Sequence, residues 1–145
     1  ISKCIWKNSG EKLTFFSSDS GVLSTIEDFK YSDFESMPDN ANERVKAGKN
    51  IEVETITLNQ LIVEEFNKVS PSYISIDTEG SEYEILNVFN FSKYHPMVLT
   101  VEHNFTELEN KIDQLMLKND YIRVFKNMTA FDSWYVSQKL LNSLR

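Results

Sequence analysis

Short apolar runs alternate with amphipathic stretches along the second half of the chain. Runs rich in β-branched and aromatic residues, typical of strands, occupy residues 51–57, 73–76 and 97–101. After each run, apolar side chains recur at helical spacing, and a Ser or Thr with a Gln or Glu three residues later precedes each of these stretches. This capping-box pattern predicts three helices that begin near Thr57, Ser81 and Thr106.

Two further pairs of strands are predicted at the ends of the chain. Residues 1–6 and 12–17 flank the turn Asn8-Ser9-Gly10, and both are expected to be strands. Residues 121–125 and 133–137 are joined by a segment too short for a helical crossover, so they are expected to pair antiparallel. Strands that alternate with helices indicate an open α/β sheet that is mostly parallel, with an antiparallel pair at its C-terminal end.

A polar segment, residues 18–50, separates the first strands from this regular pattern. It predicts a long loop with one helix that begins at Pro38 and ends before Gly48. Loops of this length in a small domain are typically functional or mobile. The aromatic residues around this segment are interpreted as core and loop anchors, with an aromatic wall over a substrate as the alternative; they are Phe15, Phe16, Phe29, Tyr31 and Phe34.

Length and composition are those of one ordinary globular domain. The chain has 145 residues, 41% of them hydrophobic and 26% charged, so residues 1–145 are expected to form a single domain. Fifteen Lys and Arg against 22 Asp and Glu give a net charge of −7, which disfavours nucleic acid and anionic membranes as partners. The single cysteine, Cys4, excludes an intrachain disulfide framework and a multi-cysteine zinc site. Because no leader-like segment opens the chain, a cytoplasmic location is expected.

Glycine is scarce, which limits how the chain could bind a nucleotide. Its four glycines are too far apart to form a G-x-G-x-x-G motif or a phosphate-binding loop; they are Gly10, Gly21, Gly48 and Gly80. The sequence therefore contains no self-contained nucleotide cradle.

Polar side chains follow two successive predicted strands, at the edge where an open parallel sheet binds ligands. One group follows strand 73–76 and the other follows strand 97–101; together they are Asp77, Glu79, Glu102, His103 and Asn104. A carboxylate after a strand is by itself more typical of a solvated turn, and a single histidine of a satisfied core position. If the two strands are neighbours, about 4.8 Å apart, the two groups converge, which predicts a shared cleft.

The segment Ile74-Ser75-Ile76-Asp77-Thr78-Glu79-Gly80-Ser81-Glu82, followed by Ile85-Leu86, resembles the signature of FkbM-type methyltransferases. Val101-Glu102-His103-Asn104 and the final strand Trp134-Tyr135-Val136 are similar to the C-terminal part of that family. The resemblance implies a Rossmann-like class I methyltransferase fold and the use of S-adenosylmethionine. It also implies that the methyl acceptor is most often a hydroxyl of a sugar, a glycan or a small natural product.

The sequence departs from the family pattern in two places. Many members have a lysine at the position of Ser75, so no role of that lysine transfers to this chain. Members also carry an upstream strand, a glycine-bearing loop and an acidic strand end that hold the cofactor, and these are missing here. The resemblance thus implies a fold truncated at the N-terminus, the C-terminal two-thirds of the domain, with cofactor-binding residues unassigned. Strand 73–76 would then have an open edge, which favours homo-oligomerisation, and the chain alone is expected to be inactive.

The resemblance implies a direct in-line methyl transfer, in which the protein orients the reactants and removes the hydroxyl proton. His103 or Asp77 is the expected base, and Glu79, Glu102 and Asn104 are expected to orient it or to bind a small-molecule or carbohydrate acceptor. The strand-end positions of Asp77, Glu102 and Asn104 resemble those of the magnesium ligands in catechol-type O-methyltransferases. We assign no metal site from the sequence, and a divalent metal stays an open alternative.

Two other functions remain as alternatives. Asp77-Thr78-Glu79-Gly80 after an apolar strand is similar to the aspartate loop of haloacid dehalogenases. That family needs a further acidic pair and a lysine at the next strand ends, whereas the next strand here is followed by Glu-His-Asn. The missing glycine loop favours the second alternative, a non-catalytic α/β remnant that acts as a binding or dimerisation module.

Overall fold

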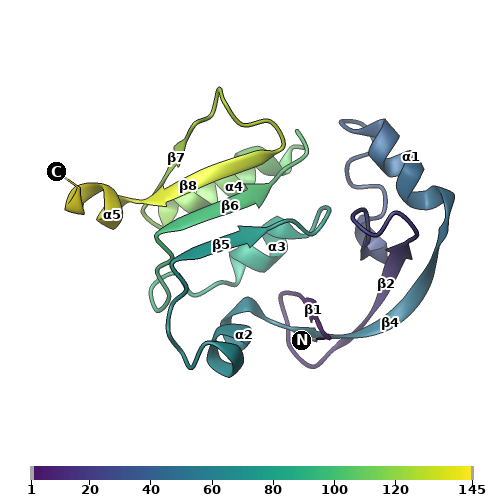
Figure 1. The fold of residues 1–145 in the computed structure, drawn as a ribbon, viewed down its shortest axis with the longest axis horizontal. Coiled ribbons are helices and arrows are strands. Elements are labelled where there is room, and N and C mark those ends of the chain that lie inside the picture. Colours follow the sequence, from purple (N-terminus) through teal and green to yellow (C-terminus); the bar gives the residue numbers. More distant parts are fainter. Residues whose placement is uncertain (1, 145) are drawn as a thin grey trace.

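A computed structural model describes residues 2–144, which form two four-stranded sheets with helices around them (Figure 1). The first sheet has the order β1-β4-β2-β3, with β1 at Cys4–Ile5, β4 at Gly48–Ile56, β2 at Lys12–Ser18 and β3 at Thr25–Ile26. The second has the order β5-β6-β8-β7, with β5 at Tyr73–Ile76, β6 at Val98–Glu102, β8 at Asp132–Ser137 and β7 at Tyr121–Val124.

The helices are α1 (Pro38–Lys46), α2 (Leu58–Glu65), α3 (Glu82–Asn87), α4 (Leu108–Lys118) and α5 (Gln138–Ser143), with a short 3₁₀ helix, η1, at Glu27–Phe29. The predicted helix after Pro38 is confirmed, and α5 was not predicted. Among residues 2–144, no helix is long and apolar enough to cross a membrane.

Strands form in both predicted N-terminal segments, although the first is only two residues long, and β4 lies between them in the sheet. β1 pairs parallel with the last two residues of β4, whereas β2 runs antiparallel to residues 48–54 of β4, from Lys12 opposite Glu54 to Ser18 opposite Gly48. β4 accommodates both partners because it is nine residues long and begins at Gly48, three residues earlier than predicted. Ile1 of the predicted strand 1–6 lies outside the described residues.

The second sheet mixes parallel and antiparallel pairs. β5 and β6 are parallel, and the predicted antiparallel pairing of β7 with β8 is confirmed. The expected parallel majority is not found, because within residues 2–144 only β1–β4 and β5–β6 are parallel. The reason lies after α4: the chain leads to β7 at the outer edge, and β8 returns antiparallel between β7 and β6 (Figure 1).

Only one of the three predicted capping boxes forms a side-chain cap of the expected kind. Thr57 Oγ1 accepts a hydrogen bond from the backbone N–H of Gln60. The hydroxyl of Ser81 donates instead to Thr78 Oγ1, and α4 begins after Glu107 rather than after Thr106.

Helices α2, α3 and α4 bury their apolar side chains against one face of the second sheet. The strands contribute Ile74, Ile76, Leu99, Val101 and Tyr135, and the helices contribute Ile62, Leu86, Ile112 and Met116. This core fixes β5 and β6 side by side, and so determines where the residues after them lie.

Candidate functional site

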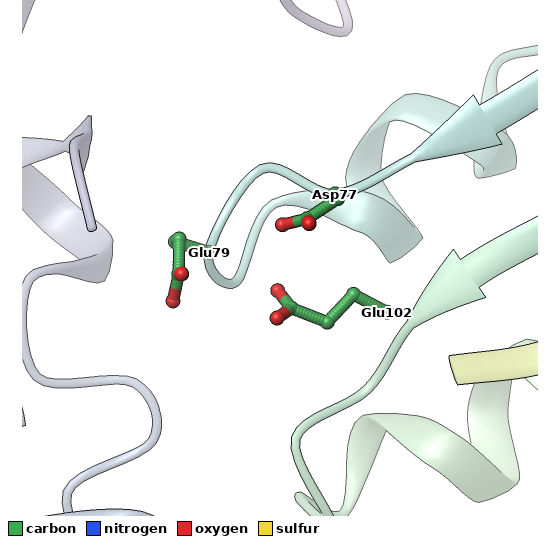
Figure 2. A group of neighbouring side chains, drawn as sticks. All are labelled: Asp77, Glu79 and Glu102. Carbon is green, nitrogen blue, oxygen red and sulfur yellow. The ribbon is translucent and has the colours of Figure 1, made fainter. Parts of the chain in front are cut away.

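The parallel register of β5 and β6 brings the two predicted polar groups to the same edge of the sheet. Ile76 pairs with Val101, so the next residues, Asp77 and Glu102, follow neighbouring strand positions. Both side chains extend from the strand ends toward the loop that carries Glu79 (Figure 2). One carboxylate oxygen from each of these three residues lies within 4.8 Å of the other two. We call Asp77, Glu79 and Glu102 the acidic cluster.

The loop that carries Glu79 is held in an uncommon backbone conformation. Glu79 has φ +58° and Gly80 has φ +119°, both in the left-handed region. The carboxylate of Glu82 stabilises the loop by accepting hydrogen bonds from the backbone N–H groups of Thr78 and Gly80. Thr25 Oγ1 also lies 3.1 Å from the carbonyl oxygens of Thr78 and Glu79. Thr25, on β3 of the first sheet, thus holds this loop in place through hydrogen bonds.

A buried arginine that the sequence analysis missed anchors the acidic cluster. The side chain of Arg44 is fully buried, and its Nη2 donates to Glu79 Oε2 over 2.5 Å. Its guanidinium also forms a bidentate pair with Asp33, with N–O distances of 2.7 and 3.1 Å. Two further hydrogen bonds go to the carbonyl oxygens of Leu23 and Lys30. The signal in the sequence was weak: Arg44 shares the buried side of α1 with Ala41, three residues earlier.

Burial makes it unfavourable to ionise all the carboxylates of the acidic cluster together. Burial raises the pKa of Glu79 to about 7, although the neighbouring charge of Arg44 opposes this shift. Burial, followed by the charges of Glu79 and Asp77, raises the pKa of Glu102 to about 9. Glu102 is 9% exposed, and its Oε2 has no hydrogen-bond partner among residues 2–144. Without a bound cation, the site therefore favours protonated carboxyl groups at Glu79 and Glu102.

His103 and Asn104 lie beside the acidic cluster but are not part of it. Both are buried, and with Glu102 they line a small pocket of about 10 Å³. Nδ1 of His103 accepts a hydrogen bond from the backbone N–H of Phe105, so we assign the proton of the neutral ring to Nε2. Burial lowers the pKa of His103, which favours this neutral form. In this tautomer His103 presents a donor, and not an acceptor, at Nε2, which has no hydrogen-bond partner among the described residues.

Residues 3–123 match a family model, the methyltransferase FkbM domain. The chain belongs to this family. Membership indicates methyl transfer as the general class of activity. No curated protein and no solved structure matches the chain at a significant level. The family match ends before β8, so the similarity of Trp134-Tyr135-Val136 to FkbM proteins lies beyond it.

A cleft of about 730 Å³ opens next to the FkbM signature residues. It lies between two segments, residues 31–36 and 105–111, and exposes the aromatic rings of Tyr31, Phe34 and Phe105. Ser32 and Thr106 line both this cleft and the small pocket at Glu102 and His103. The aromatic-wall alternative therefore applies to Tyr31 and Phe34, whereas Phe16 is buried.

The expected open edge of the FkbM sheet is present at β5. Within the described part of the chain, β5 pairs only with β6. A largely apolar pocket of about 310 Å³ runs along this edge between β5 and α2 and reaches Asp77 and Thr78. The edge lies next to the acidic cluster, so whatever covers it would border the site.

Proposed function

We propose that the protein transfers a methyl group from S-adenosylmethionine to a hydroxyl of a sugar, a glycan or a small natural product. The observation that carries this proposal is the convergence of Asp77 and Glu102 at the sheet edge of an FkbM domain, beside an aromatic cleft. Such an edge is where open α/β sheets bind their ligands.

The cleft suits an acceptor that has both apolar faces and hydroxyl groups. Tyr31 is 60% exposed, Phe34 48% and Phe105 53%, so their rings are free to contact a sugar or another flat ligand. The hydroxyls of Ser32 and Thr106 lie where this cleft meets the pocket at Glu102. An acceptor bound against the rings would thus reach toward the acidic cluster with a hydroxyl.

The residues present fit one end of the cofactor. S-adenosylmethionine supplies an electrophilic methyl group on a positively charged sulfur. The converging carboxyl oxygens of Asp77, Glu79 and Glu102 suit such a cation. The four glycines of the sequence form no loop that would hold the nucleoside end, so we assign no residue to that end.

Asp77 is the base that we propose for the acceptor hydroxyl. A neutral hydroxyl is a weak nucleophile, and a positioned carboxylate accepts its proton as the new carbon–oxygen bond forms. Asp77 is exposed at the sheet edge, whereas the Nδ1 of His103 is occupied by the N–H of Phe105. We propose that His103 donates a hydrogen bond to the acceptor, and that Glu79, Glu102 and Asn104 orient it.

The test is methyl transfer from isotope-labelled S-adenosylmethionine by the natural polypeptide that contains these residues, with a panel of hydroxylated acceptors. We expect S-adenosylhomocysteine and an O-methylated product, and a decrease in kcat of about 10²-fold or more for Asp77→Asn. Glu65→Gln, an exposed carboxylate on α2, is the control and should behave as wild type. Methylation of an amine or a carboxylate, or full activity of Asp77→Asn, would overturn the proposal.

A further inference from the structure

One buried carboxylate oxygen in the acidic cluster lacks a partner. Oε2 of Glu102 forms no hydrogen bond within residues 2–144, although Glu102 is only 9% exposed. Its carboxylate is aimed into the space between Asp77 and Glu79 (Figure 2). A buried polar atom without a partner is costly, and in native structures it commonly marks the place of a water or an ion. This orphaned atom is an observation separate from the proximity of the three carboxylates.

The charge around this atom favours a cation over a neutral ligand. Asp33 and Glu82 add their carboxylates to those of the acidic cluster, whereas Arg44 is the cation that contacts it. Arg44 is already paired with Asp33, and Glu82 is occupied by the loop N–H groups. The carboxyl groups of Asp77 and Glu102 therefore have no cationic partner among the contacts of the described residues.

We propose that Asp77, Glu79 and Glu102 bind a hard divalent cation such as Mg²⁺ or Mn²⁺. Oxygen ligands of such ions lie about 2.0–2.6 Å from the metal, so two ligands of one ion are separated by at most about 4–5 Å. The three carboxylates meet this limit, with one oxygen each within 4.8 Å of the others. Glu79 has a second oxygen available, because the hydrogen bond to Arg44 uses Oε2 only.

The donor set selects the class of ion. All three ligands are carboxylates, which suit hard cations, and the one cysteine of the chain, on β1, is not part of this group. Asp77 is exposed, so water and an acceptor hydroxyl can complete the coordination. A hydroxyl bound to the cation would lose its proton more readily, in addition to any action of Asp77. This last step alone rests on the proposed function; binding of the cation does not.

The experiment is a Mn²⁺ titration of the protein followed by electron paramagnetic resonance, without S-adenosylmethionine or acceptor. We expect saturable binding of one ion, competition by Mg²⁺, and at least about tenfold weaker affinity in Asp77→Asn and in Glu102→Gln. Glu65→Gln, the same chemical change outside the acidic cluster, should bind Mn²⁺ as wild type does. Circular dichroism of each variant verifies its fold, and the exposed Asp77 gives a variant that does not disturb the core.

Two outcomes would overturn the cation site. One is the absence of saturable Mn²⁺ binding up to millimolar concentration, which would mean that Asp77 and Glu102 share a proton instead. The other is unchanged affinity in both cluster variants. Saturable binding that is lost in the cluster variants, together with no methyl transfer, would support the cation site and overturn the proposed function.

Discussion

Arg44 on α1 and Glu79 in the loop after β5 form a buried ion pair across 35 residues of sequence, with an Nη2–Oε2 distance of 2.5 Å. The same guanidinium holds Asp33, so the segment between η1 and α1 is bound to the site loop through one side chain. The long polar segment of the sequence is therefore a structured part of the site. The order of this segment depends on the charge of Arg44, which is far from the acidic cluster in the sequence.

Replacing Arg44 should destabilise the fold strongly. In Arg44→Met, the carboxylates of Asp33 and Glu79 stay buried without their cation, a loss that typically costs about 3–5 kcal/mol. Arg44→Lys keeps the charge but not the planar fork, so its stability should lie between those of Arg44→Met and wild type. Urea unfolding followed by circular dichroism measures both. A loss below about 1 kcal/mol in Arg44→Met would show that the pair does not hold this segment.

How far the sequence predicts the site follows from the range over which its parts interact. Asp77 and Glu102 each follow a strand directly, so strand periodicity and the parallel pairing rule suffice to place them together. Arg44 interacts only through tertiary contacts with Asp33 and Glu79, and no local pattern encodes such a partner. The position of β4 between β1 and β2 is a similar case, because pairing order depends on which edges remain free after folding.

Gly80 should tolerate no side chain. An added Cβ would overlap Ser32 Oγ and lie 2.9 Å from Ser32 Cβ, at a φ of +119° that L-residues rarely adopt. Gly80→Ala should therefore cost clearly more than the roughly 1 kcal/mol that the backbone conformation alone accounts for. Gly10→Ala is the matched control, since Gly10 has φ +77° and nothing within 4 Å of an added Cβ. Equal losses in the two variants, by urea unfolding, would refute the close approach.

Stability without divalent cations should fall as pH rises. The pKa of Glu79 is raised from 4.5 to about 7, and that of Glu102 from 4.5 to about 9. The folded state therefore binds more protons than the unfolded state from pH 4.5 to about 9. Unfolding free energy then decreases with increasing pH over this window. Urea unfolding at pH 5.5 and pH 8.5 in the presence of a chelator tests this, and Glu102→Gln should flatten the dependence. Greater stability at pH 8.5 than at pH 5.5 would contradict it.

S-adenosylmethionine should bind the 145-residue chain only weakly. The acidic cluster suits its cationic end, but the glycines of the sequence form no loop for its nucleoside end, and one edge of β5 is unpaired within residues 2–144. Isothermal titration calorimetry with the chain alone should show a Kd well above the micromolar range. Micromolar affinity would mean that residues other than a glycine loop bind the nucleoside.

The aromatic cleft should determine affinity for the acceptor rather than the rate of transfer. Aromatic contacts of this kind contribute about 0.5–1.5 kcal/mol each, so Tyr31→Ala and Phe34→Ala should raise the KM for the acceptor by roughly 2–10-fold with kcat nearly unchanged. Both rings are largely exposed, so the substitutions should leave the fold intact.

Phe125→Ala is the matched control, since this residue is 55% exposed and lies after β7, outside the cleft lining. Steady-state kinetics with saturating S-adenosylmethionine separates the two parameters. A ring that binds the ground state and the transition state equally changes KM alone. An equal rise in KM for Phe125→Ala, or a decrease confined to kcat in the cleft variants, would therefore place the acceptor elsewhere.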